Sequence, residues 1–367
     1  MPNPRTTPRY TQRNVSDGYR RCTRCGNVYP ATPEYFYART NGRLELCQGT
    51  ATEGCRQAYF RNYAADRAAA ATAAITGATT TATGRRFGVE VEFIGNAAAV
   101  ARAVEAAGYR CEVARYGHTV TPDRWRIVPD GSVPNGSELV SPPLIGEAGR
   151  AEVVKVLRAA VEAGATVDRT CGLHVHHEVP EFDAPRLARL LRVWANAQGA
   201  TDALVAPSRR DGRWCHHLPP RMVEAAAEYA RQGLPWTPAH AARAITGGER
   251  YLALNVDCLP RYGTVEVRQH QGTTNGVKVT AWTEYGQAVI AYALTTAPAP
   301  VDGVALADWL RMLVDGGHLA PVTAEYLADR AAALDLDHTP RPVEVTPCEC
   351  GDPECTVTAD RAAARGW

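Results

Sequence analysis

Three short stretches of this sequence carry polar side chains that alternate with valine. They are Glu90 and Glu92 in GVEVEF, His174 and His176 in GLHVHH, and Glu266 and Arg268 in TVEVRQ. Because successive side chains of a β-strand point to opposite faces, each pair would project from one face while the valines pack on the other. Solvated sheet faces also collect Glu and Arg, but three such pairs that include histidines and an arginine favour a functional site.

Carboxylates outnumber nitrogen ligands in this set, and an oxygen-rich site suits Mg²⁺ or Mn²⁺ better than Zn²⁺. The guanidinium of Arg268 offers a planar fork for a phosphate or a carboxylate. Neither Lys155 nor Lys278, the two lysines of the chain, follows a glycine in a GxxxxGK pattern, so a P-loop is excluded. The combination points to an enzyme that handles a phosphate-bearing species through divalent cations.

The elements that must position these pairs are runs of strands separated by single helices. We predict strands at RFGVEVEFIG, at 109–114, 125–128, 138–141 and 172–178, and at YLALNVD and GTVEVRQH. We predict helices at NAAAVARAVEAAG, at EAGRAEVVKVLRAAVEAG, and at 185–198, 219–232, 238–245 and 277–294, the last of them amphipathic. This order indicates an α+β body with a largely antiparallel sheet.

The motifs together resemble a known family. FGVEVEF, DGSVPNGSELVSPPL, TCGLHVHHEV, YLALNV and TVEVRQHQGTTN occur in the order and approximate spacing of the putative amidoligase family, a branch of the glutamine synthetase and glutamate-cysteine ligase superfamily. The resemblance spans residues 84–300 and implies a glutamine-synthetase-like α+β catalytic domain with flanking helices. It also implies an ATP- and Mg²⁺-dependent ligase that forms an amide bond through an acyl phosphate.

The resemblance implies roles for individual residues. The divalent cations would be held by Glu90, Glu92, Glu138, His174 and Glu266, with Asp130 as a further candidate. The nucleotide would be contacted by His176, Glu92 and Asn275, and the catalytic set would be Arg268, Glu266 and Arg250. His270, two residues beyond Arg268, would share its face of the strand. Amino acids, peptides, polyamines and protein side chains all remain open as substrates.

Two other interpretations remain open. HVHHE is close to the H-x-H-x-D pattern of binuclear metal-dependent hydrolases, with Glu178 where Asp is expected and Val179 where a third histidine would follow. A hydrolase of this kind would give no role to Glu90 and Glu92 or to Glu266 and Arg268. Alternatively, the body has lost activity and the protein is a non-catalytic zinc-finger adaptor.

Residues 1–63 are predicted to form a small zinc-binding module. The ligands of a structural Zn²⁺ would be Cys22, Cys25, Cys47 and Cys55, in an arrangement that resembles treble-clef modules common in phage proteins. Seven residues separate the second pair where two would be usual. Residues 1–70 contain eleven arginines, no lysine and five acidic residues, which suits contact with nucleic acid or protein, although solubility explains this charge equally well.

The remaining segments complete the predicted organisation. Residues 64–84, rich in Ala, Thr and Gly, would link the module to a catalytic domain over 85–335. In the tail, 336–367, Cys348, Cys350 and Cys355 form either a second zinc knuckle or part of a frayed end. The sequence has no apolar run of eighteen residues and no signal-peptide core, and its cysteines cluster at the two ends. We therefore expect a cytoplasmic protein, with a phage origin suggested by the module.

Overall fold

The computed structural model describes residues 19–22, 28–31, 36–38, 44–47 and 70–337, apart from 116, 118–120 and 135. The chain divides into two compact units, Met1–Ala78 and Thr79–Trp367. The division falls inside the predicted linker.

The first unit contains two small antiparallel ladders. β1 (Tyr19–Arg21) pairs with β2 (Val28–Pro30), and β3 (Phe36–Ala38) pairs with β4 (Leu44–Cys47). Cys22 is buried directly after β1. Cys25 and Cys55 lie outside the described residues, as do the three cysteines of the tail. The zinc module, the C-terminal knuckle and the domain bounds therefore stay predictions.

A seven-stranded sheet forms the frame of the second unit, with the strand order β10-β11-β9-β5-β8-β7-β6. The strands are β5 (Phe87–Ile94), β6 (Cys111–Val113), β7 (Trp125–Pro129), β8 (Gly136–Val140), β9 (Gly172–Glu178), β10 (Leu254–Asn255) and β11 (Thr264–Gln271). Neighbours run antiparallel except β6 and β7. The predicted α+β class with a largely antiparallel sheet and flanking helices is confirmed.

The six predicted helices are present, but the helices at 207–209, 259–262, 306–315 and 321–337 were not predicted. All of these helices lie in the second unit. They are α2 (Ala97–Ala106), α3 (Gly146–Glu162), α4 (Ala184–Asn196), α5 (Gln198–Ala203), α6 (Pro220–Arg231), α7 (Pro238–Thr246), α8 (Leu259–Tyr262), α9 (Gly276–Ala293), α10 (Leu306–Asp315), α11 (Pro321–Asp337) and the short 3-10 helix η2 (Pro207–Arg209). The predicted helix 185–198 is divided into α4 and α5, and the predicted strand YLALNVD shortens to two residues.

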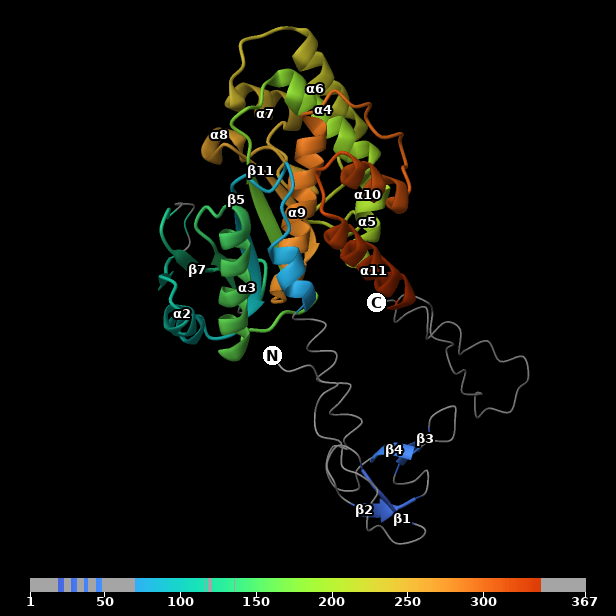
Figure 1. The fold of residues 1–367 in the computed structure, drawn as a ribbon. Helices are drawn as coiled ribbons and strands as arrows, with labels where there is room; N and C mark the ends of the chain where they lie inside the picture. Colours follow the sequence, from blue (N-terminus) through green and yellow to red (C-terminus); the bar gives the residue numbers. More distant parts are fainter. Residues whose placement is uncertain are drawn as a thin grey trace, which may run out of the picture. The chain divides into compact units, whose positions relative to one another are not determined.

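α9 is the central helix of this unit (Figure 1) and contacts α3, α4 and β9. Most residues of the helix are buried, including the polar Thr283, Glu284 and Gln287, so it is not the amphipathic helix that we expected. Glu284 accepts hydrogen bonds from the backbone N–H of Ala320 and the hydroxyl of Thr323. These bonds join α9 to the start of α11.

A close contact between α9 and β9 depends on a glycine. The ring of His177 is fully buried, and a Cβ at Gly286 would lie 2.4 Å from its Nε2. Burial, with the nearby charges of Arg85 and His176, lowers the pKa of His177 to about 3. His177 therefore packs as a neutral ring on the face of β9 opposite to His174 and His176.

The end of the predicted linker belongs to the second unit. The hydroxyl of Thr81 donates to the carbonyl of Gly317 and lies 3.0 Å from Nδ1 of His318, while Ala82 and Thr83 are buried. The chain is thus anchored just before β5 begins. Among the described helices, none combines the length and apolar character needed to cross a membrane.

We expect Gly286→Ala to lower the free energy of unfolding by about 1–3 kcal/mol, because the added methyl group overpacks the ring of His177. Urea unfolding of the purified protein measures this loss. Gly199→Ala is the matched control, because Gly199 is an exposed helical glycine with nothing within 4 Å of its Cβ position. It should be neutral or stabilising by up to about 1 kcal/mol. Equal stabilities for the two variants would contradict the packing described for His177.

Candidate active site

The strand register brings the predicted polar pairs onto one face of the sheet. Glu90 of β5 lies opposite His174 of β9, and Glu266 of β11 lies opposite His176. On the other side of β5, Glu92 lies opposite Glu138 of β8. The alternating valines beneath, Val89, Val175 and Val267, are fully buried. Four neighbouring strands thus present their polar side chains to a single region.

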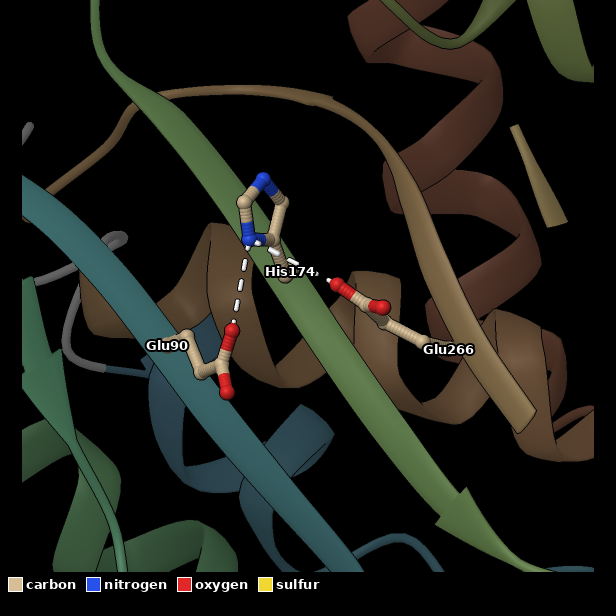
Figure 2. Close-up of side chains that lie close together, drawn as sticks. All are labelled: Glu90, His174 and Glu266. Carbon is tan, nitrogen blue, oxygen red and sulfur yellow. Dashed lines mark hydrogen bonds and ion pairs between the residues drawn. The ribbon is translucent and has the colours of Figure 1, made fainter. Parts of the chain in front are cut away.

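His174 lies at the centre of four carboxylates. Its Nδ1 is 3.4 Å from Glu90 Oε2, 3.6 Å from Glu266 Oε1 and 3.8 Å from Glu138 Oε1, and its Nε2 is 3.6 Å from Glu92 Oε1. Figure 2 shows the imidazole between Glu90 and Glu266, which approach it from the two flanking strands. His174 is 5% exposed, so these contacts are largely shielded from water.

The ligand atoms form two groups that share His174. Glu90, His174 and Glu266 make one group, and Glu92, Glu138 and His174 make the other; within each group the atoms lie within 4.8 Å of one another. Most of these ligands are carboxylate oxygens, which Mg²⁺ and Mn²⁺ prefer. Burial, followed by the charges of Glu90, Glu92, Asp130 and Glu266, raises the pKa of Glu138 well above its usual value. The residues therefore fit divalent cations, which would offset this excess of negative charge.

His176, two residues beyond His174 on the same face of β9, contacts the same cluster. Its Nε2 lies 3.3 Å from Glu90 Oε1, its Nδ1 lies 2.9 Å from the hydroxyl of Thr264, and its ring packs edge-on against Tyr262. Burial alone would lower the pKa of His176, but Glu90 and Glu266 together raise it well above its usual value. The cluster therefore favours the charged imidazolium.

Arg268 forms an ion pair with Glu266, and its Nε lies 3.5 Å from the carbonyl oxygen of Trp214. Burial would raise the pKa of Glu266, yet Arg268, His176 and His174 lower it below its usual value. Glu266 is therefore an ionised carboxylate between a guanidinium and two imidazoles.

A cavity of about 1040 Å³ opens over this face of the sheet. Among the residues that line it are the predicted Glu90, Glu92, Asp130, Glu138, His174, His176, Arg250, Glu266 and Arg268. Arg250 is at the exposed rim, where its guanidinium lies 5.0 Å from the ring centre of Tyr251. Asp130 accepts hydrogen bonds from the N–H and hydroxyl of Ser132, which close a turn after β7.

The structure places one predicted site residue elsewhere. Asn275 does not line the cavity; its side chain caps α9 by accepting from the N–H groups of Val277 and Lys278. The asparagine that contacts the cluster is Asn255, whose Nδ2 donates to Glu266 Oε2 at 2.8 Å. In the sequence, Asn255 directly follows the apolar run YLAL, but we did not predict it as a site residue.

His270 also departs from expectation. A β-bulge between Val267 and His270 shifts the register of β11 against β9. The extra residue moves His270 to the other face, where its ring packs 5.1 Å from that of Trp282 on α9. His270 therefore does not share the face of Arg268.

The start of β9 is the tightest point of the cluster. The N–H of Gly172 donates to Glu92 Oε2 at 2.6 Å. A Cβ at Gly172 would lie 3.0 Å from Arg209 Nη2, 3.2 Å from His174 Nε2 and 3.4 Å from Glu92 Oε1. Arg209 follows no strand motif, so its position beside the cluster is apparent only from the structure.

The fold and this cluster define an α+β protein with an acidic, histidine-centred site suited to divalent cations. Residues 83–290 match the model of the family described as putative amidoligase enzyme. Since the match covers more than half of the 367 residues, the chain belongs to this family. The resemblance drawn from the motifs is confirmed.

Two solved structures are similar to this chain. One is described as a novel glutamine synthase homolog, with a TM-score of 0.34, 16% identity and coverage of 69% of this chain and 66% of its own, slightly under two thirds. The other, a GmaS/ADP complex, has a TM-score of 0.35, 16% identity and coverage of 76% and 74%. At TM-scores this low, neither structure bears on the chemistry of the site. No curated protein matches the chain.

We expect Glu138→Gln to stabilise the metal-free protein and to weaken its response to Mg²⁺. The pKa of Glu138 is raised in the folded state, so its ionisation opposes folding. Stability is therefore lost as the pH rises from the pKa of this carboxyl in the unfolded chain through its pKa in the folded protein. At pH 7.5 the variant should gain at least about 1.4 kcal/mol, the equivalent of one pKa unit.

Urea unfolding in EDTA and in Mg²⁺ measures both effects. The exposed Glu224→Gln on α6 is the control and should stay within about 0.5 kcal/mol of wild type. A Mg²⁺ response of wild-type size in Glu138→Gln would count against this carboxylate as a ligand.

Proposed function

We propose that this protein is an ATP-dependent carboxylate-amine ligase that forms an amide bond through an acyl phosphate. The observation that carries the proposal is the arrangement of four carboxylates around His174, with Arg268 beside them, in a member of the amidoligase family. A cavity of about 1040 Å³ has room for a nucleotide and a second substrate.

The chemistry requires activation because a carboxylate is a poor electrophile. A carboxylate oxygen attacks the γ-phosphorus of ATP, the bond from that phosphorus to the bridging oxygen breaks, and ADP leaves. The amine nitrogen then attacks the carbonyl carbon of the acyl phosphate, the bond to the phosphate oxygen breaks, and the amine loses a proton. The products are an amide, ADP and inorganic phosphate, and no covalent protein nucleophile is needed.

The proposed role of the carboxylates is to hold Mg²⁺ or Mn²⁺. Glu90 and Glu266 would bind one ion and Glu92 and Glu138 another, with His174 available to both. When bound, such ions neutralise phosphate oxygens and thereby lower the cost of phosphoryl transfer.

The cationic side chains have separate proposed tasks. The guanidinium of Arg268, fixed by Glu266, would donate to the phosphoryl oxygens as their charge develops, and Arg250 at the rim would assist it. The imidazolium of His176 would face the nucleotide, because it lies on the cavity wall two residues further along β9 than the shared ligand His174.

For the N-terminal unit, we propose the functions predicted from its sequence. Cys22, Cys25, Cys47 and Cys55 would bind a structural Zn²⁺, and the surrounding arginines would contact nucleic acid or protein. The cytoplasm is the proposed location, because zinc-bound thiolates persist where thiols stay reduced.

Release of phosphate from ATP tests the ligase chemistry. Wild-type protein with Mg²⁺ and pooled amino acids, peptides and polyamines should release phosphate only when substrates are present. Glu92→Ala and Arg268→Ala should each lower this rate by about a hundredfold or more, because the first removes a proposed cation ligand and the second removes the guanidinium that would donate to the phosphoryl oxygens. Glu224→Ala, an exposed substitution outside the cavity, should retain the wild-type rate.

Two results would contradict the proposal. Metal-dependent hydrolysis of an amide or ester that needs His174 and His176, without ATP turnover, would establish a hydrolase. A fully folded protein that binds neither ATP nor Mg²⁺ would favour the non-catalytic adaptor.

A further inference from the structure

Arg209 is a buried guanidinium in the cavity wall that has no carboxylate partner. It is 6% exposed, and its Nη2 donates to the carbonyl oxygen of Arg268 at 3.0 Å. Its Nε is buried without a hydrogen-bond partner, and within the described part of the chain it forms no ion pair. Arg268 and Arg85, by contrast, are neutralised by Glu266 and Glu181.

A buried cation without a counterion is costly, because the protein interior replaces little of the hydration that it loses. Glu92 lies near Arg209 but is already bound to the N–H of Gly172 and the ring of His174. The unused donors of the guanidinium therefore suit an anion supplied from the cavity, and a planar fork matches the oxygens of a carboxylate or phosphate.

The position of Arg209 distinguishes between those two anions. Gly172, His174, His176 and Glu178 alternate along one face of β9, and the last three of them line the cavity. Arg209, which also lines the cavity, approaches this face at the Gly172 end through its Nη2. The Gly172 and His176 ends are about 13 Å apart at the usual rise of a strand. In the proposed function, the nucleotide lies at the His176 end and the transferred phosphoryl group lies near His174. The attacking oxygen approaches phosphorus from the side opposite to the leaving group. The acceptor carboxylate would therefore lie at the Gly172 end.

We propose that Arg209 binds the carboxylate of the acid substrate, the group that is phosphorylated. This inference rests on the proposed ligase function. Arg209 donates to the carboxylate and leaves one of its oxygens directed at the γ-phosphorus. As that oxygen forms its bond to phosphorus, the bond to ADP breaks, and Arg209 gives and takes no proton.

The segment from α5 to η2 holds Arg209 in this position. Gln269, inside the β-bulge, is fully buried and donates to Asp202 Oδ1, and its Oε1 accepts from Gln198. The N–H of Ala206 donates to the side chain of Gln271. These bonds join the segment to the strand that carries Arg268, so the two guanidinium groups are fixed relative to each other.

Binding of two small anions tests the proposal without knowledge of the natural substrate. Acetate, which carries only the reacting carboxylate, is titrated by saturation-transfer NMR in the presence of Mg²⁺ and a non-hydrolysable ATP analogue. Inorganic phosphate is titrated in the presence of Mg²⁺ and ADP. The variants are Arg209→Gln and Arg209→Lys, with the exposed Arg221→Gln on α6 as a control that also removes one positive charge.

Arg209→Gln should weaken acetate binding at least about tenfold, as expected for losing a charge-assisted hydrogen bond, and should change phosphate and nucleotide affinity by less than about twofold. Arg209→Lys should fall between Gln and wild type. The melting temperature of metal-free Arg209→Gln should equal or exceed that of wild type, because an unpaired buried charge is removed.

Several outcomes would overturn the assignment. If acetate does not bind to wild type, or binds equally well to Arg209→Gln, Arg209 is not the carboxylate-binding residue. If Arg209→Gln loses phosphate affinity selectively, Arg209 binds the phosphoryl group instead. A large fall in melting temperature would show a structural role. Failure of wild type to bind the ATP analogue would refute the ligase proposal itself, whereas analogue binding without acetate binding would refute only the role of Arg209.

Discussion

The structure depends on one electrostatic constraint: four carboxylates must be held together on one face of a sheet. Among the described residues, His174, His176, Arg268, Asn255 and the N–H of Gly172 contact them with opposite charge or hydrogen bonds, and the pKa of Glu138 is still raised well above its usual value. Without a ligand, such an arrangement opposes folding. Its persistence is understandable if divalent cations complete it, because they supply the positive charge that the side chains lack.

The rest of the catalytic unit supports this face. The strands β8, β5, β9 and β11 are adjacent, so their registers bring the polar pairs together, while buried valines fill the layer below. α9 packs under β9 and leaves space for the ring of His177 by having a glycine at 286. At the other end of β9, Gly172 allows Glu92, His174 and Arg209 to approach one another. Glycines thus permit close packing on both faces of one strand.

Much of this site could be predicted from the sequence because it follows a local rule. Alternation along three strands was enough to place Glu90, Glu92, His174, His176, Glu266 and Arg268 on common faces. The rule failed where the backbone departed from regular geometry. The bulge in β11 turned His270 toward Trp282, and no pattern in TVEVRQHQ marks the extra residue.

Residues brought in by tertiary structure were also missed. Asn255 reaches Glu266 because β10 pairs with β11, and Arg209 reaches the cluster because α5 and η2 fold against the bulge. Asn275 was assigned to the nucleotide by its place after the strand, whereas its side chain begins α9. Long-range contacts of this kind leave no periodic signal in the chain.

The central claim is that His174 is shared by two groups of cation ligands. Anomalous diffraction at the manganese edge, from crystals of the full chain grown with Mn²⁺ and ADP, tests it most directly. We predict two manganese peaks, one against Glu90 and Glu266 and the other against Glu92 and Glu138, with both weakened in His174→Ala. Manganese bound only elsewhere, or two peaks unchanged in His174→Ala, would contradict it.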